Sequence, residues 1–231
     1  FSVGLFQNTI RNATPVILAA MGGLFTEHAG IMNIGMDGMI LVGAFTAVVF
    51  SYLFASAPMG VLFAVIIGIA IGLFFALFVV KLKADEFVIG TTVNIFAGGV
   101  TIYLLRSVFH QIDTWVSKDI KGLPPIEIPL IKDIPVLGDI LSGYSLFVYL
   151  SWVFVILVWF FLYRTPYGFW IRAAGEHPSA LETAGIDPVK MKFLASVLCG
   201  IFCGLAGAHL SLGYLNCFQE GMSASRGFIA F

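Results

Sequence analysis

Long apolar stretches dominate the chain, and short polar segments separate them. Six runs of mostly apolar residues lie at roughly 8–26, 38–56, 59–80, 87–105, 144–163 and 193–212. A helix needs about 20 such residues to cross about 30 Å of hydrocarbon, because each residue advances it by about 1.5 Å. None of the runs alternates with the two-residue period of a barrel strand. Backbone groups in lipid must be satisfied internally, so the pattern predicts an all-α, polytopic transmembrane helical bundle of about six spans.

The composition excludes other classes of protein. Of 231 residues, 59% are apolar and only 11% are charged, whereas soluble domains have about 45–50% apolar and about 25% charged residues. Twelve Lys and Arg with 13 Asp and Glu cannot give a protein of this size a soluble surface. The formal net charge of −1 offers no attraction for a phosphate backbone. We therefore expect a lipid membrane as the surroundings and no nucleic acid as a partner.

Basic residues set the expected orientation. Lys and Arg gather in the short connection around Lys81–Lys83 and in the segment 164–192. Short loops rich in Lys and Arg stay on the cytoplasmic side, so both segments are predicted to be cytoplasmic. The longer segment 107–143 and the N-terminus are then external. Residues 1–231 read as a single transmembrane domain.

Polar residues next to the spans are the candidate pathway residues. Glycines at 30, 35 and 38 interrupt the apolar pattern after the first span, as in a broken helix that lines a transport path, although a plain cytoplasmic turn has the same pattern. Asn33 and Asp37 share a face if this segment is helical, and Asn94 is the amide of the fourth span. Such groups face a bundle interior in lipid. They serve there either as contacts between helices or as the lining of a pathway, and the residues leave both readings open.

The segment 164–192 is too charged for the membrane and too patterned for a linker. Residues 175–185 read as one short helix, with Pro178 at the first helical position and Gly185 at the left-handed C-terminal position. So short a helix is unstable alone and must dock on the bundle or on a partner protein.

Motifs for catalysis are missing from the sequence. It contains no G-x-x-x-x-G-K-[ST] loop, no G-x-S-x-G elbow and no H-E-x-x-H helix. Cys199, Cys203 and Cys217 have no His or carboxylate at ligand spacing, so we expect packing roles and no metal. An enzyme is not expected, and an intramembrane enzyme or a structural scaffold remain the alternatives from other classes.

Several stretches, in order along nearly the whole chain, resemble a known family. The family is that of permease subunits of ABC importers for nucleosides and simple sugars, which work with lipoproteins of the basic membrane protein family. The stretches are 22–27, 29–39, 164–168, 174–178, 184–186, 204–208 and 221–230. Within them, N-I-G-M-D-G at 33–38 and R-G-F-I-A at 226–230 are the more specific. The family usually has Glu in place of Asp37 and often Asn in place of His177. It also continues beyond the last motif, so we expect the chain to be incomplete at its C-terminus.

The resemblance implies a machine with several subunits in a bacterial cytoplasmic membrane. A second permease would complete the pathway for a nucleoside or simple sugar, a substrate-binding lipoprotein would deliver it, and a separate ABC ATPase subunit would bind the ATP. The segment 176–185 would be the coupling helix that touches the ATPase. Its expected apolar contacts are Ala180, Leu181 and Ala184, and its polar rim is Glu176, His177 and Glu182, with Gly185 ending the helix. A branched-chain amino-acid or ribose-type permease is the alternative within transport.

The chain also contains a weak internal repeat. A Gly-rich span followed by a broken polar segment occurs at 17–38 and again at 198–227. The expected topology makes the two copies run in opposite senses, as inverted repeats do in transporters.

Overall fold

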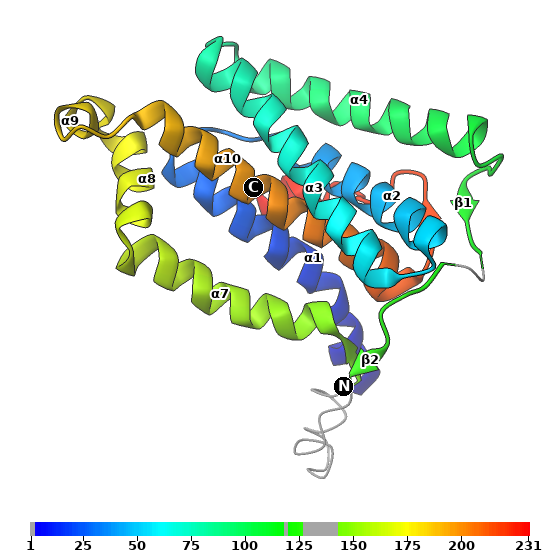
Figure 1. The fold of residues 1–231 in the computed structure, drawn as a ribbon. Coiled ribbons are helices and arrows are strands. Elements are labelled where there is room, and N and C mark those ends of the chain that lie inside the picture. The colour runs from blue at the N-terminus through cyan, green and yellow to red at the C-terminus, as the bar shows by residue number, and fades with distance from the viewer. Residues whose placement is uncertain (1–2, 118–119, 127–142) are drawn as a thin grey trace.

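The computed structural model describes residues 3–117, 120–126 and 143–231, which form a helical bundle (Figure 1). Five of its helical stretches are long and apolar enough to cross a membrane. They are α2 (Met36–Phe54), α3 (Ala57–Ala76) with its π-helical end η1 (Leu77–Lys81), α4 (Glu86–Ser107), α7 (Leu146–Arg164), and α10 (Pro188–Ala208) with its π-helical end η2 (His209–Leu215). These five match five of the six predicted spans, and the all-α transmembrane class is confirmed.

The first predicted span is helical but differs from the other five. Helix α1 (Val3–His28) is longer than the predicted 8–26, and its N-terminal half carries polar side chains such as Gln7 and Asn12. It is not among the helices whose length and apolarity alone qualify them as spans. It nevertheless packs along α10 within the bundle, between α10 and α7 (Figure 1).

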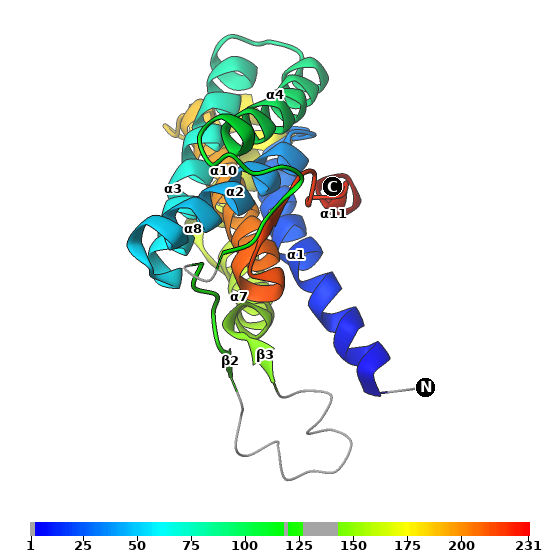
Figure 2. The ribbon, with the colours of Figure 1, turned by 90° about the vertical axis from the view of Figure 1, so that its right-hand side faces the viewer.

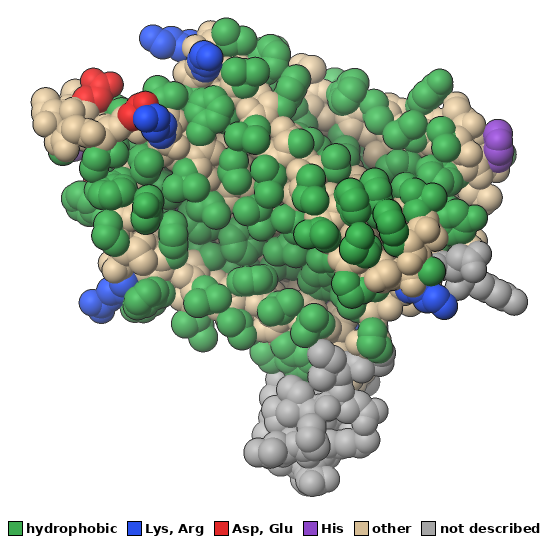
Figure 3. All heavy atoms as spheres, viewed as in Figure 1, with side chains coloured by type: hydrophobic (Ala, Val, Ile, Leu, Met, Phe, Trp, Pro, Cys, Tyr) green, Lys and Arg blue, Asp and Glu red, His purple; other side chains and the backbone are tan. Residues whose placement is uncertain are grey.

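Helix α10 lies at the centre and touches its neighbours backbone to backbone. It packs against α3, α2 and α1, and small residues let these helices approach closely. A Cβ atom on Gly68 of α3 would overlap the carbonyl oxygen of Gly200 of α10, and a Cβ on Gly207 would overlap the carbonyl oxygen of Ile40 of α2. Glycine is therefore required at these crossings. Apolar side chains cover the face of the bundle over α3, α10 and α7, as lipid contact requires (Figure 3).

The two ends of the bundle differ in what connects the helices. At one end lie the connection after Lys81 and the segment from Arg164 to Asp187, together with the turn after α1, where Gly30 approaches Gly175. At the other end β1 (Thr114–Trp115) pairs antiparallel with β4 (Phe218–Gln219), and β2 (Pro125–Ile126) pairs with β3 (Tyr144–Ser145). Both basic segments thus share one end, as predicted. Residues 118–119 and 127–142 of the predicted external segment lie outside the described residues.

Two breaks in the chain turn it back into the bundle. After α1, Gly30 adopts a φ of +68° and residues 31–35 lead to the start of α2. After η2, Asn216 ends the helix in the left-handed region, and the chain passes through β4 to the short helix α11 (Arg226–Ala230). Helix α11 packs beside α1 and α2 (Figure 2). Helices α1 and α10 run in opposite directions (Figure 1), and the repeat of 17–38 at 198–227 stays a prediction.

The predicted helix at 175–185 is wrong in its bounds. The structure has two helices here, α8 (Pro166–Glu176) and α9 (Pro178–Thr183), joined at His177. Pro166 and Pro178 each open a helix, because proline lacks the N–H group that a first turn leaves unpaired. The predicted position of Pro178 is confirmed, as is the left-handed conformation of Gly185, whose φ is +81°. Thr165 caps α8 by accepting a hydrogen bond from the amide of Gly168.

Candidate functional site

The polar residues singled out in the sequence meet at the start of α2. We call this cluster the polar junction and define it as Asn33, Asp37, Asn94, Ser223 and Gly227. It joins the break after α1 with α2, α4 and the segment that leads into α11. Within the described part of the chain, no three His, Cys, Asp or Glu side chains lie close enough to hold a metal ion.

Asn33 organises the chain just before α2. Its side chain is fully buried. The Oδ1 atom accepts a hydrogen bond from the amide of Gly35 at 3.1 Å, and Nδ2 donates to the sulfur of Cys199 at 3.3 Å. The amide thus fixes the turn and ties it to α10. This observation also gives Cys199 a packing role, as predicted, with a polar contact in addition.

Asn94 performs a similar task from α4. Its Oδ1 atom accepts a hydrogen bond from the amide of Gly38 at 2.7 Å, and its Nδ2 donates to the carbonyl oxygen of Ile34 at 3.0 Å. The first amides of a helix have no partner within the helix. The side chain of Asn94 satisfies one of them across the α2–α4 interface.

Asp37 reaches the other break in the chain. Its Oδ1 atom accepts a hydrogen bond from the amide of Gly227 at 3.1 Å, and its Oδ2 atom accepts one from the hydroxyl of Ser223 at 3.0 Å. A carboxylate is strongly favoured where it accepts hydrogen bonds at the first turn of a helix. The side chain is half-buried rather than enclosed.

The junction therefore joins the three predicted residues by their side-chain hydrogen bonds to backbone groups. Sequence reasoning missed Ser223 and Gly227 as their partners, although both belong to the C-terminal stretch that carries the resemblance. Asp37, through Ser223 and Gly227, holds the two breaks together, whereas Asn33 and Asn94 tie the first break to α10 and α4. Such contacts are what the helix-contact reading expects. Asn33 is fully buried, whereas Asp37 and Asn94 are partly exposed.

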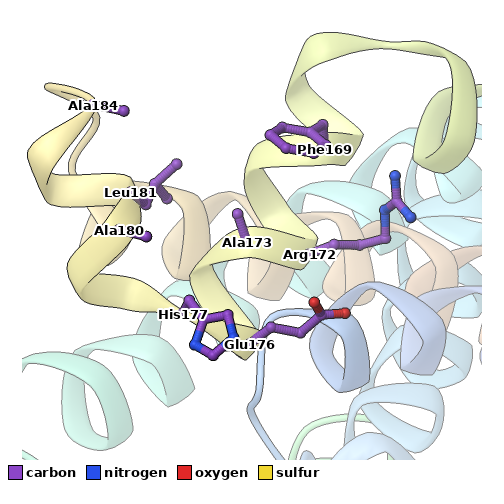
Figure 4. Close-up of a pocket in the computed structure, with 8 residues that line it drawn as sticks. All are labelled: Phe169, Arg172, Ala173, Glu176, His177, Ala180, Leu181 and Ala184. Atoms are coloured by element: carbon purple, nitrogen blue, oxygen red, sulfur yellow. The ribbon is translucent and has the colours of Figure 1, made fainter.

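The second candidate site is the pair of helices α8 and α9. They enclose a groove of about 350 Å³, which we call the α8–α9 groove (Figure 4). Phe169, Ala173, Ala180, Leu181 and Ala184 supply its apolar lining, and Arg172, Glu176 and His177 supply its polar lining. Phe169 is 61% exposed in the chain by itself, so the groove has an apolar rim open to a partner.

The predicted coupling residues divide into two groups. Ala180, Glu182, Ala184 and Gly185 are exposed, as are Glu176 and His177. Leu181 is only 4% exposed and points from α9 toward α8 (Figure 4). Its burial makes it an anchor between the two helices within this chain, in addition to any contact it makes with another subunit.

A third polar cluster escaped the sequence analysis. His209 is 1% exposed, and its two ring nitrogens lie 3.4 Å from the hydroxyl of Ser145 and 3.3 Å from the carbonyl oxygen of Arg11. The guanidinium of Arg11 lies over the ring of Tyr144 at 5.6 Å. Burial raises the pKa of Tyr144, against a smaller lowering by Arg11. A single His in an apolar run gives no signal in the sequence for this cluster, which ties α1, β3 and η2 together.

Comparisons with known proteins cover almost the whole chain. The family described as the permease component of branched-chain amino acid transport systems matches residues 5–231. The guanosine ABC transporter permease protein NupQ of Bacillus subtilis is 35% identical over 96% of this chain and 71% of its own length. The nucleoside ABC transporter permease protein NupC of Lactococcus lactis is 32% identical over 98% of this chain and 73% of its own length.

A relative whose name mentions a sugar is similar to this chain to nearly the same degree. The putative glucose ABC transporter permease protein TsgC13 of Haloferax volcanii is 32% identical over 100% of this chain and 69% of its own length. No solved structure matches the chain significantly.

Proposed function

Since this chain belongs to the permease family of branched-chain amino acid transport systems, it is a multi-pass membrane subunit of an ABC importer, and we propose that it carries a nucleoside. The observation that carries the substrate class is the likeness to a guanosine permease and a nucleoside permease over nearly the whole chain. A simple sugar is the second candidate, because a relative named for glucose is almost as similar.

The pathway is proposed to run beside the polar junction. Two broken segments meet there, and transporters place their substrate sites where discontinuous helices meet near the middle of the membrane. A nucleoside and a sugar both present hydroxyl groups, which amides and a carboxylate can bind. A second permease subunit then supplies the facing wall of the pathway. Asp37 and Asn94, which are partly exposed, are the members of the junction best placed to touch the substrate.

The partners follow the family. Permeases of ABC importers work with an ATPase and a substrate-binding protein, and here we propose a lipoprotein as the binding protein and a bacterial cytoplasmic membrane as the site. The end of the bundle that holds Lys81, Arg164 and Lys190 is proposed to face the cytoplasm, because short basic loops remain there. The ATPase then docks on the α8–α9 groove, whose exposed apolar rim suits a protein contact.

Uptake by the assembled transporter tests the substrate class. Vesicles that contain both permeases, the ATPase and the binding protein are supplied with ATP and either labelled guanosine or labelled glucose. ATP-dependent guanosine uptake, competed by other nucleosides and not by glucose, is the expected result. Uptake of glucose without uptake of guanosine would replace the nucleoside by the second candidate.

A further inference from the structure

A groove between α1 and α7 shares no lining residue with the polar junction or the α8–α9 groove. It has a volume of about 370 Å³, and we call it the α1–α7 groove. Apolar side chains such as Ala20, Leu24 and Val155 line its length, and His28, Trp159 and Tyr163 line the end that lies at the basic end of the bundle. Its chemistry therefore changes along its length, from hydrocarbon to aromatic and polar.

Two arginines stand at that end of the groove. The guanidinium of Arg172 lies 4.9 Å from the centre of the Tyr163 ring, and that of Arg164 lies 5.8 Å from the centre of the Trp159 ring. The ring of His28 meets Tyr163 edge to face at 6.3 Å. A cation that lies over the face of an aromatic ring is held there but keeps its charge. The two positive charges are therefore held where the apolar groove ends.

Neither arginine is neutralised by a carboxylate. Within residues 3–117, 120–126 and 143–231, no ion pair involves Arg164 or Arg172, and the buried Nε atom of Arg172 has no hydrogen-bond partner. Figure 4 shows the Arg172 side chain directed away from α9. Glu27 and Glu176 are exposed at the same end and pair with neither guanidinium.

We propose that the α1–α7 groove binds an anionic phospholipid of the cytoplasmic leaflet. One acyl chain lies in the apolar part of the groove, Trp159 and Tyr163 lie at the level of the interface, and the phosphate accepts hydrogen bonds from Arg172 and Arg164. Aromatic side chains prefer this level of a bilayer, and basic pockets between membrane helices bind anionic headgroups. The choice of leaflet rests on the orientation proposed above. Arg172 also lines the α8–α9 groove, so lipid retention rather than ATP hydrolysis is the measurement that reports on this site.

Native mass spectrometry of the purified, assembled transporter tests the proposal. The complex is prepared in mild detergent with added phosphatidylglycerol or phosphatidylcholine, and the retained lipid is counted. Wild type should retain phosphatidylglycerol in preference to phosphatidylcholine. The double variant Arg164→Gln with Arg172→Gln should lower its retention about tenfold or more, since each basic group contributes appreciably to binding an anionic surface. Lys81→Gln, at the same end but on η1, is the matched control and should retain phosphatidylglycerol as wild type does.

A second variant tests the apolar part of the site. Ala20→Phe fills the groove without changing its charge and should also lower retention of phosphatidylglycerol. Gel filtration of each variant confirms that the subunits still assemble. Loss of lipid in the arginine variant but not in Ala20→Phe would mean adsorption of a headgroup to the surface, and would overturn the proposal. Equal retention by wild type and the arginine variant, or no retained phosphatidylglycerol in wild type, would overturn it as well.

Discussion

The amide of Gly227 donates a hydrogen bond to the carboxylate of Asp37 at 3.1 Å, across 190 residues of sequence. A Cβ atom on Gly227 would overlap the backbone of Asp37, so the two segments touch at their main chains. The start of α2 and the start of α11 thus meet through one carboxylate. This contact joins the two breaks that turn the chain back into the bundle.

Removing the carboxylate of Asp37 should weaken this contact. Asp37→Ala loses two hydrogen bonds to a charged group and should lower the free energy of unfolding by about 2 kcal/mol or more. Asp37→Asn keeps an oxygen for the amide of Gly227 and should cost less than half as much. Thermal unfolding of the purified complex measures both. In transport, Asp37→Ala should reduce uptake more than it reduces expression, and normal uptake would exclude Asp37 from the pathway.

The glycines at the centre of the bundle should tolerate no side chain. Gly200→Ala places a Cβ against the carbonyl oxygen of Gly68, so the helices must separate, and overpacking of this kind costs roughly 1–3 kcal/mol. Gly99→Ala on α4 is the matched control, because a Cβ there meets nothing within 4 Å. Both changes favour helix equally, by about 1 kcal/mol. The melting temperature should therefore fall for Gly200→Ala and hold or rise for Gly99→Ala; equal changes would contradict the close crossing.

The α8–α9 groove should respond to charge at its exposed lining. Ala180→Asp places a carboxylate in the groove without removing a packed side chain, and should abolish most substrate-stimulated ATP hydrolysis by the assembled transporter. Thr183→Asp adds the same charge on the same helix, outside the lining of the groove, and should spare that activity. If both variants hydrolyse ATP like wild type, the ATPase docks elsewhere.

From the sequence, Leu181→Asp looks like a direct test of docking. The structure makes it a weak one, because Leu181 is buried within this chain. Because Leu181 is 4% exposed, the new carboxylate would be buried between α9 and α8. A buried charge without a partner destabilises the fold. We therefore expect the variant to be less stable whether or not residue 181 contacts another subunit.

Cys217 offers a natural reporter of the orientation. It lies between η2 and β4, at the end of the bundle opposite the basic segments, whereas Cys199 and Cys203 are buried. An impermeant maleimide should label Cys217 in intact cells, and Cys217→Ser should abolish the labelling. Burial raises the pKa of Cys217, so its labelling rate should keep rising with pH beyond the range of a free thiol.

An introduced cysteine on the other end controls the experiment. Thr183→Cys, on exposed α9, should react only after the membrane is permeabilised. Labelling of residue 183 but not of Cys217 in intact cells would reverse the proposed orientation.

The sequence predicted the spans because apolarity over about 20 residues decides insertion regardless of packing. It predicted that Asn33, Asp37 and Asn94 face the bundle interior, as helix contacts or as the lining of a pathway, because polar groups are costly in lipid. The sequence could not identify the residues that partner Asp37. Ser223 and Gly227 come to Asp37 only after α10, η2 and β4 have carried the chain back, and no local pattern records that return.

The helices α8 and α9 show a second limit. A six-residue helix such as α9 has no face of its own until it docks, so neither the break at His177 nor the burial of Leu181 could be inferred. His209 is a third case: its partners Arg11 and Ser145 lie on other elements, and an isolated imidazole in an apolar run does not indicate them.

The glycine crossings of α10 constrain how the transporter moves. Helices that touch through their main chains cannot slide or rotate past one another without overlap, so α2, α3 and α10 must travel as one rigid body. Helix α7 meets the bundle differently, through the rings of Phe25 with Phe161 and of Phe154 with Phe202. Rings can change rotamer, and a helix held by them can pivot. Gly175 of α8 also touches the turn after α1 through its main chain. Any rearrangement of this part during the transport cycle is therefore to be sought as a pivot of α7, with α8 held against the end of α1.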